Sequence, residues 1–125
     1  MEEQCLGIDW GAARIGLAIG NSGAKLASPL GTAASVNDIT SICRKEKIER
    51  LVVGQPFSLA GREPDEDQPF GRFIEELMEL SLPISLVDER LSSKAADSLD
   101  PAARKEGNRD AIAAMVILQS YFDSL

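Results

Sequence analysis

Two short apolar runs near the amino end, separated by only five residues, constrain the fold most strongly. The runs are Leu6–Asp9 and Ile15–Ile19, and their connection, Trp10–Arg14, contains a glycine. Strands joined this closely pair antiparallel as a hairpin. A third run, Ala27–Leu30, predicts another strand, and Pro29 favours an edge position for it because proline cannot donate to the sheet ladder. The chain is therefore expected to begin with antiparallel strands.

Beyond these strands the apolar spacing alternates between the helical and the strand period. The expected elements are, in order, a helix from a cap at Asn37 or Asp38 to about Lys47, a strand at Leu51–Val53, a helix beginning at Pro69 and ending before Pro83, a strand at Ile84–Val87, a short helix starting at Ser92 or Ser93, and a helix over Arg109–Asp123 capped by Asn108. The last helix is expected to pack through Ile112, Met115, Val116, Ile117 and Leu118. Strands that alternate with helices predict a parallel continuation of the sheet, with helices on both faces. We expect one α/β domain over residues 1–125.

The absence of histidine excludes several kinds of catalytic site. Ser–His–Asp and Cys–His catalysis and histidine-based zinc chemistry all require a residue that this chain lacks. Its two cysteines have no C-x-x-C partner; Cys5 precedes an apolar run and Cys43 lies on the apolar face of a predicted helix, so we expect both to be small buried hydrophobes. Acid–base or metal chemistry must therefore use carboxylates, lysines or water.

Charge and hydropathy limit where the protein is expected to act and what it is expected to bind. No apolar stretch reaches the roughly 18 residues that a membrane span needs, and Met1–Gln4 carries two glutamates where a targeting sequence would be basic. We therefore expect a cytoplasmic protein with no membrane contact. A net charge of −7 disfavours nonspecific coating of nucleic acid, although a local basic patch could still bind phosphates.

Acidic residues stand where buried strands are expected to end. Asp9 follows an apolar strand and is flanked by Gly7 and Gly11, which leave room for a close backbone approach. A charge there costs several kcal/mol unless it is paired or binds a cation. Asp88 and Glu89 follow the last strand, and because alternate side chains point to opposite faces, only one of the two can share a face with Asp9. The alternatives are that Asp9 is a turn residue that caps Trp10–Arg14, and that the acids at 88 and 89 form only an ordinary surface Asp–Arg pair.

Asp110 supplies a third carboxylate, in the first turn of the last helix. Acids are common at helix starts for electrostatic reasons, which is the simpler interpretation of this residue. Three carboxylates from two strand ends and a helix start could also converge on a hard cation. Mg²⁺ is held by one or two carboxylates together with waters and phosphate oxygens, and a pair of such ions can promote phosphodiester hydrolysis.

Four blocks of the chain are similar to those of the YqgF/RuvX family. The blocks are G-I-D-W-G-A-A-R-I-G-L-A, V-V-G-Q-P, D-E-R-L-S-S-K-A-A and R-D-A-I-A-A-M-V-I-L-Q-S-Y, in this order over nearly the whole chain. Members of this family are described as Holliday-junction-resolvase-like proteins and as nucleases that process pre-16S rRNA in ribosome biogenesis. The resemblance implies an RNase H-like fold and a divalent-metal site.

Matched motif to motif, the resemblance implies that Asp9, Glu89 and Asp110 are catalytic and hold Mg²⁺ or Mn²⁺. Gly7, Gly11 and Asp88 would then have supporting structural roles. Two departures from the family pattern remove possible substrate contacts: Ala13 stands where a basic residue is common, and the stretch before the last helix is shorter than usual. The resemblance favours cleavage at the 5′ end of pre-16S rRNA, with branched DNA as the alternative substrate.

Several basic residues border the proposed carboxylates and could bind phosphates of the nucleic acid. They are Arg14, Arg90, Lys94, Arg104, Lys105 and Arg109. Of these, Arg14 and Arg90 are the better candidates because they adjoin the acidic positions. Trp10 could stack on a base, although packing beside the sheet is the more common role of such a residue.

Two other classes of function stay open on the sequence alone. The first block also resembles the strand–Asp–x–Gly–turn–strand phosphate loop of actin-like and sugar-kinase-like ATPases, although 125 residues supply only one of the two lobes that those enzymes need. A catalytically silent scaffold that binds a ribosomal or repair partner is the other. A homodimer would suit a symmetric junction substrate.

Overall fold

The leading strands form the predicted antiparallel hairpin and its extension. The computed structural model describes residues 2–11, 13–56, 68–88 and 108–125. Strand β1 (Gln4–Asp9) pairs antiparallel with β2 (Ile15–Asn21), which pairs antiparallel with β3 (Leu26–Ala33). All three are longer than the apolar runs, because the flanking residues continue the ladder.

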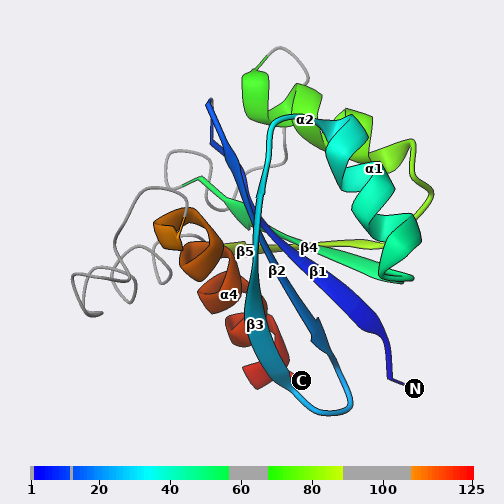
Figure 1. Ribbon diagram of the computed structural model, residues 1–125, viewed down its shortest axis with the longest axis vertical. Coiled ribbons are helices and arrows are strands. Elements are labelled where there is room, and N and C mark those ends of the chain that lie inside the picture. Colours follow the sequence, from blue (N-terminus) through cyan, green and yellow to red (C-terminus); the bar gives the residue numbers. More distant parts are fainter. Residues whose placement is uncertain (1, 12, 57–67, 89–107) are drawn as a thin grey trace.

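Two parallel strands complete the sheet. Strand β4 (Arg50–Gln55) pairs parallel with β1, and β5 (Ile84–Asp88) pairs parallel with β4, which gives the strand order β3-β2-β1-β4-β5 (Figure 1). The predicted mixed sheet, with β3 at an edge, is confirmed. Strand β1 lies at the centre, so its carboxyl end is surrounded by neighbours on both sides.

Three helices are described, and two of their starts differ from prediction. Helix α1 (Val36–Lys45) is capped by Ser35, whose side chain accepts from the backbone N–H of Asp38, so the expected cap at Asn37 or Asp38 is wrong. Helix α2 (Pro69–Met78) carries proline in its first turn, as predicted. Helix α4 (Asn108–Asp123) includes Asn108, which was expected to precede it as a cap. The short helix expected at Ser92 or Ser93 lies outside the described residues.

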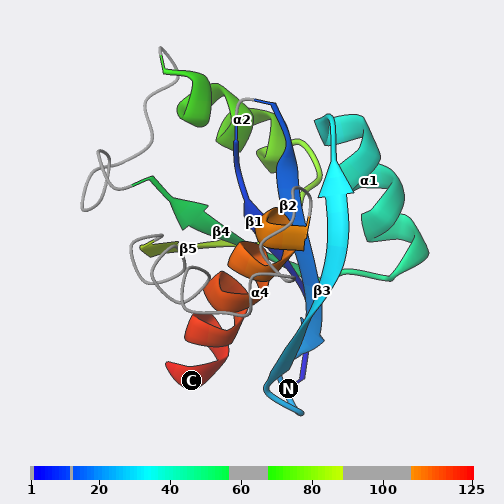
Figure 2. The same ribbon diagram turned by 60° about the vertical axis from the view of Figure 1, so that its left-hand side comes forward.

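The helices cover both faces of the sheet, as predicted. Helices α1 and α2 lie on one face and α4 lies across the other (Figures 1 and 2). Alternate residues of β1 divide between the two cores: Leu6 and Ile8 belong to the cluster under α1 and α2, whereas Cys5 packs with α4. No helix in the described ranges has the length and apolarity to cross a membrane.

Helix α4 approaches the sheet closely because glycines replace side chains beneath it. A Cβ at Gly7 would lie 2.8 Å from the Ala114 carbonyl oxygen, and one at Gly20 would lie 2.8 Å from the Phe122 ring. Alanines of α4 are accordingly buried, whereas Ile112 and Val116, which we expected in the core, are only half-buried. The helix therefore packs through its small residues together with its larger buried side chains, Ile117, Leu118 and Phe122.

The cysteines are buried as predicted. Cys5 lies in the core under α4 and Cys43 in the core under α1, and both are free thiols. Burial raises the pKa of the Cys43 thiol to about 11. Burial and then the nearby Glu3 carboxylate raise the pKa of the Cys5 thiol to about 11. Both thiols are therefore neutral at physiological pH and act as apolar packing groups.

Candidate functional site

Asp9 is the last residue of the central strand and is half-buried. The alternation along β1 assigns its side chain to the α4 side of the sheet, because Gly7 faces α4 and Leu6 and Ile8 face the opposite core. Trp10 turns to that opposite side, where its ring packs 5.9 Å from Phe70. Consecutive residues at this strand end therefore serve the two faces of the sheet.

Gly16 lies between Asp9 and the start of helix α4, where Asp110 stands. Gly16 is the cross-strand partner of Asp9 in the β1–β2 ladder. A Cβ at this position would collide with the carbonyl oxygen of Asp110 and would lie 2.5 Å from its carbonyl carbon. The first turn of α4 thus rests directly on the strand residue that neighbours Asp9. Asp9 and Asp110, about a hundred positions apart in the chain, are thus both neighbours of Gly16 at the carboxyl end of β1.

Arg14 is the charged partner of Asp110. Its Nε donates to Asp110 Oδ2 at 2.8 Å, from the connection between β1 and β2 to the first turn of α4. The two side chains are 40% and 28% exposed, so the pair contributes at most about 1 kcal/mol to folding. An arginine also stays protonated at any ordinary pH. The pair therefore orients the Asp110 carboxylate while leaving it accessible from solvent.

Asp88 lies on the other side of the sheet from Asp9. It is the last residue of β5, and its Cα partner in the ladder is Gln55, a buried polar residue. Ile84 and Leu86, which alternate with it in β5, face the α2 side, where they line a groove with Ile74 of α2. The alternation therefore assigns Asp88 to that side as well. Glu89, the other acid predicted at this strand end, lies outside the described residues.

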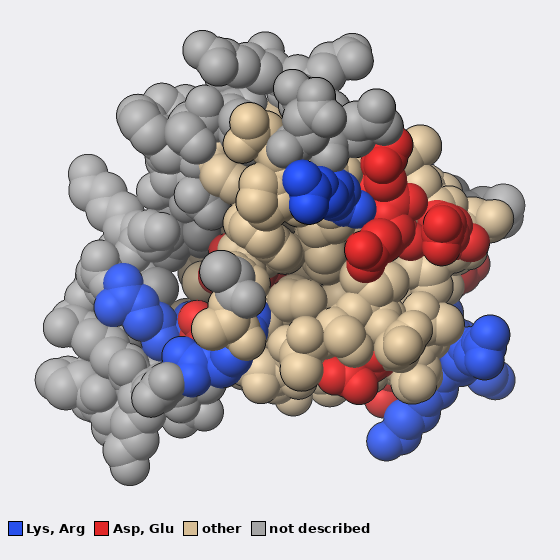
Figure 3. All heavy atoms as spheres, turned by 90° about the horizontal axis from the view of Figure 1, so that it is seen from above, with Lys and Arg blue, Asp and Glu red and all other residues tan. Residues whose placement is uncertain are grey.

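Of the basic residues predicted to bind phosphate, two are described. Arg14 is half-buried, whereas Arg109 is exposed beside Asp110 at the start of α4. The other predicted phosphate contacts lie outside the described residues; they are Arg90, Lys94, Arg104 and Lys105. Figure 3 looks down on the molecule from above, and its Lys and Arg side chains stand in separate groups, with a large group of Asp and Glu side chains beside one of them. Charge of both signs is therefore present on this face of a chain whose net charge is −7.

The donor set at this end fits a hard divalent cation. Asp9 and Asp110 supply carboxylate oxygens, and Mg²⁺ needs only one or two protein carboxylates when waters and phosphate oxygens complete its shell. Within the described ranges, no three residues of the Asp, Glu, Cys and His types come together as a metal site. The described part of the chain thus contributes two of the three predicted ligands.

Comparisons with known proteins identify the family. The family model described as "RuvX: Holliday junction resolvase" matches residues 3–124. The chain belongs to the RuvX family. A relative from Rickettsia canadensis (strain McKiel), named "Putative pre-16S rRNA nuclease", is 36% identical to this RuvX chain over 98% of the chain and 87% of the relative. Another of the same name, from Rickettsia akari (strain Hartford), is 32% identical over 96% of the chain and 86% of the relative.

Solved structures extend the comparison to the fold. The structure titled "T. thermophilus RuvC in complex with Holliday junction substrate" matches with a TM-score of 0.59 and 14% identity, over 98% of this chain and 94% of that one. The structure titled "Thermus thermophilus RuvC structure" gives a TM-score of 0.55 and 13% identity, over 99% and 95%. At such low identity the likeness concerns the fold, and it confirms the predicted RNase H-like architecture.

Sequence reasoning missed three residues at this end of the RuvX chain. Gly16, which receives the start of α4, belongs to the first family block, and a glycine inside an apolar strand is a signal for close backbone approach. Gln55 is a polar residue that directly follows the buried apolar residues of β4, and its position at this strand end was itself a signal of a functional residue. Arg72 lies on the exposed side of α2 and nothing in its local sequence distinguishes it from a solvated charge.

Proposed function

We propose that this RuvX chain is a divalent-metal-dependent endonuclease that hydrolyses phosphodiester bonds in structured nucleic acid. The observation that carries the proposal is that Gly16, at the carboxyl end of the central strand, adjoins both Asp9 and Asp110. This edge is where open α/β sheets place their ligands. The names of the relatives support the same activity.

Glu89 is the third ligand in this proposal. Asp88 lies on the side of the sheet opposite Asp9, because Ile84 and Leu86, which alternate with it in β5, face α2. The motif match likewise favours Glu89 over Asp88.

Asp9, Glu89 and Asp110 would hold Mg²⁺ or Mn²⁺ through their carboxylate oxygens. When bound, one or two such ions lower the pKa of an attacking water and stabilise the leaving oxygen of the phosphodiester. Arg14 keeps the Asp110 carboxylate oriented toward the strand end and adds positive charge there. Because this ion pair is exposed and weak, an incoming cation can compete with it at little cost.

The proposed substrate is pre-16S rRNA, cleaved at its 5′ end, on the strength of the relatives' names. Branched DNA is the second candidate, because the matching family model carries the description of a Holliday junction resolvase. Arg14 and Arg109 are the described residues that would contact phosphates, joined by Arg90 and Lys94 from the block that follows β5. Phosphate contacts of this kind position the nucleic acid without reading its sequence.

The test is a cleavage assay with Mg²⁺ or Mn²⁺ on a structured pre-16S rRNA leader and on a four-way DNA junction. Asp9→Asn should abolish cleavage and keep the fold, as judged by circular dichroism. Asp123→Asn is the matched control, since it makes the same change at the exposed far end of α4 and should cleave as wild type. If wild type cuts neither substrate, or if Asp9→Asn cuts as well as wild type, the proposal is wrong.

A further inference from the structure

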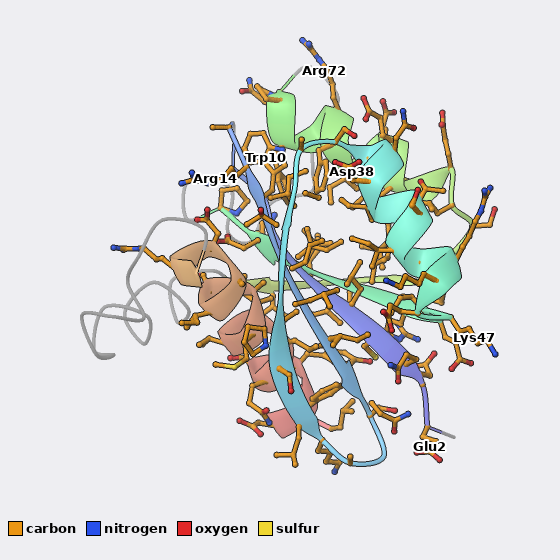
Figure 4. All side chains as sticks on the ribbon, viewed as in Figure 1. Glu2, Trp10, Arg14, Asp38, Lys47 and Arg72 are labelled. Carbon is orange, nitrogen blue, oxygen red and sulfur yellow. The ribbon has the colours of Figure 1, made fainter. Side chains whose placement is uncertain are left out.

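A pocket of about 250 Å³ opens at the same end of the molecule, on the face of the sheet that α1 and α2 cover. Its walls come from three segments that are distant in sequence: the β1–β2 connection, the junction of β3 with α1, and the first turns of α2. In Figure 4 the labelled Trp10 and Arg14 lie side by side at this end and Arg72 extends outward from α2 above them, whereas Lys47 and Glu2 lie in the lower part of the view. The proposed metal ligands do not line this pocket.

The lining combines an aromatic wall with positive charge. Trp10 and Phe73 both line the pocket, and their ring centroids lie 6.2 Å apart. Two arginines, Arg14 and Arg72, line the pocket, together with one acid, Glu76. On a chain whose net charge is −7, a pocket with more cationic than anionic lining residues is suited to an anionic ligand that also has a flat apolar group.

Arg14 connects this pocket to the carboxylate edge. It lines the pocket and also donates to Asp110 Oδ2 at 2.8 Å. Asp9 and Trp10 are consecutive residues whose side chains serve opposite faces of the sheet. A ligand that reaches both must therefore lie across the end of β1, which a polymer with repeated phosphates can do.

We propose that the pocket holds a nucleotide of the substrate strand next to the bond that is cut. Its base lies against Trp10, and its phosphate lies between Arg14 and Arg72. Stacking on an aromatic side chain is available to every base, because each base has a flat π-face. The inference rests on the proposed nuclease function and adds to it a binding site outside the metal ligands. Trp10 thus has two roles, since the same ring also packs against the core.

The experiment uses the single tryptophan of the chain as its reporter. Octauridylate is titrated into the protein in EDTA, which prevents cleavage, and Trp10 emission is recorded together with the anisotropy of a labelled copy of the oligonucleotide. Binding should quench Trp10 in step with the rise in anisotropy. Arg72→Gln should weaken binding by about tenfold, because it removes a charged hydrogen bond to phosphate. The slope of log affinity against log salt concentration should also become shallower by about 1, the amount expected for the loss of one phosphate contact.

The matched control is Lys47→Gln, which removes one positive charge at the far end of the molecule (Figure 4). It should leave both the affinity and the quenching as in wild type. Arg72 and Lys47 are not packed in the core, so neither change should unfold the protein, and thermal melting checks this.

The outcomes separate this inference from the proposed function. If octauridylate binds by anisotropy while Trp10 emission stays constant, or if Arg72→Gln binds as tightly as wild type, the pocket is not occupied and the inference is wrong, although metal-dependent cleavage would still support the nuclease. If tripolyphosphate quenches Trp10 more strongly than octauridylate at equal phosphate concentration, the occupant is a free polyphosphate and the inference is also wrong. If wild type neither binds the oligonucleotide nor cleaves nucleic acid with Mn²⁺, both fail together.

Discussion

Gly16→Ala should slow cleavage by more than its loss of folded protein explains. The new Cβ would lie 2.5 Å from the carbonyl carbon and 3.1 Å from the Cα of Asp110, whereas ordinary Cβ contacts are 3.4–4 Å. The obstacle is helix backbone, which cannot rotate away as a flexible side chain could. The first turn of α4 must therefore retreat by about 1 Å, at a cost of about 1–3 kcal/mol in the free energy of unfolding.

The same displacement carries the Asp110 carboxylate away from Asp9. A misplacement of about 1 Å in a catalytic group can cost about 100-fold in rate, so kcat/KM for metal-dependent cleavage should fall by roughly that factor. The assay is single-turnover cleavage at saturating Mn²⁺, corrected for the folded fraction measured by urea denaturation.

Gly20→Ala is the control for overpacking alone. Its Cβ would lie 2.5 Å from the Leu26 carbonyl oxygen and 2.8 Å from Phe122, at the far end of the same helix. It should cost comparable stability and leave the cleavage rate of the folded protein near that of wild type. Equal rates for Gly16→Ala and Gly20→Ala, after the same correction, would refute the role given to the glycine beside Asp9.

Three further predictions concern charges and thiols. Arg14→Gln should change the unfolding free energy by less than about 1 kcal/mol, since its ion pair is exposed, yet weaken oligonucleotide binding severalfold; an unchanged affinity by anisotropy would contradict this. Glu89→Gln should abolish cleavage while Asp88→Asn keeps most of it, and the reverse order in the cleavage assay would exchange their roles. Burial raises the pKa of the Cys5 and Cys43 thiols from the usual 9.0 to about 11, so their contribution to stability should be constant below pH 9 and be lost toward pH 11, by at most about 1.4 kcal/mol per pH unit for each thiol. Urea denaturation at pH 8 and pH 10 should show this loss in wild type and a smaller one when both cysteines are alanine.

The sheet was predictable because its strands follow local rules. The short connection between the first two apolar runs requires an antiparallel hairpin, and Pro29 correctly indicated the edge strand. The helix–strand alternation then implied parallel strands with helices on both faces. These features depend on the spacing of apolar residues, which the sequence displays directly.

The start of α1 and the packing of α4 depend on tertiary contacts instead. Ser35, Asn37 and Asp38 are all good capping residues, and the choice among them depends on where strand β3 ends. On α4, the largest apolar residues suggested the buried stripe, but glycines on the strands below select the face with alanines. Which strand residues lie under which helix turn is not encoded in either segment alone.

The candidate site was only partly predictable, because part of it also depends on tertiary contacts. Asp9 stood out because it ends a buried strand, and Asp110 became informative only together with it. Both adjoin Gly16 because α4 crosses over the sheet there, which brings together residues distant in sequence. The pocket beside Trp10 was likewise hidden, because Arg72 joins it from a helix whose local sequence gives no sign of a ligand.

Asp9, Glu89 and Asp110 are proposed to share a divalent cation, and a crystal soaked in Mn²⁺ would reveal that ion. Anomalous difference maps should show at least one peak about 2.0–2.2 Å from carboxylate oxygens of these residues, in wild type and not in Asp9→Asn. A map without a peak at the carboxyl end of β1, or with a peak held by other acids, would contradict the account.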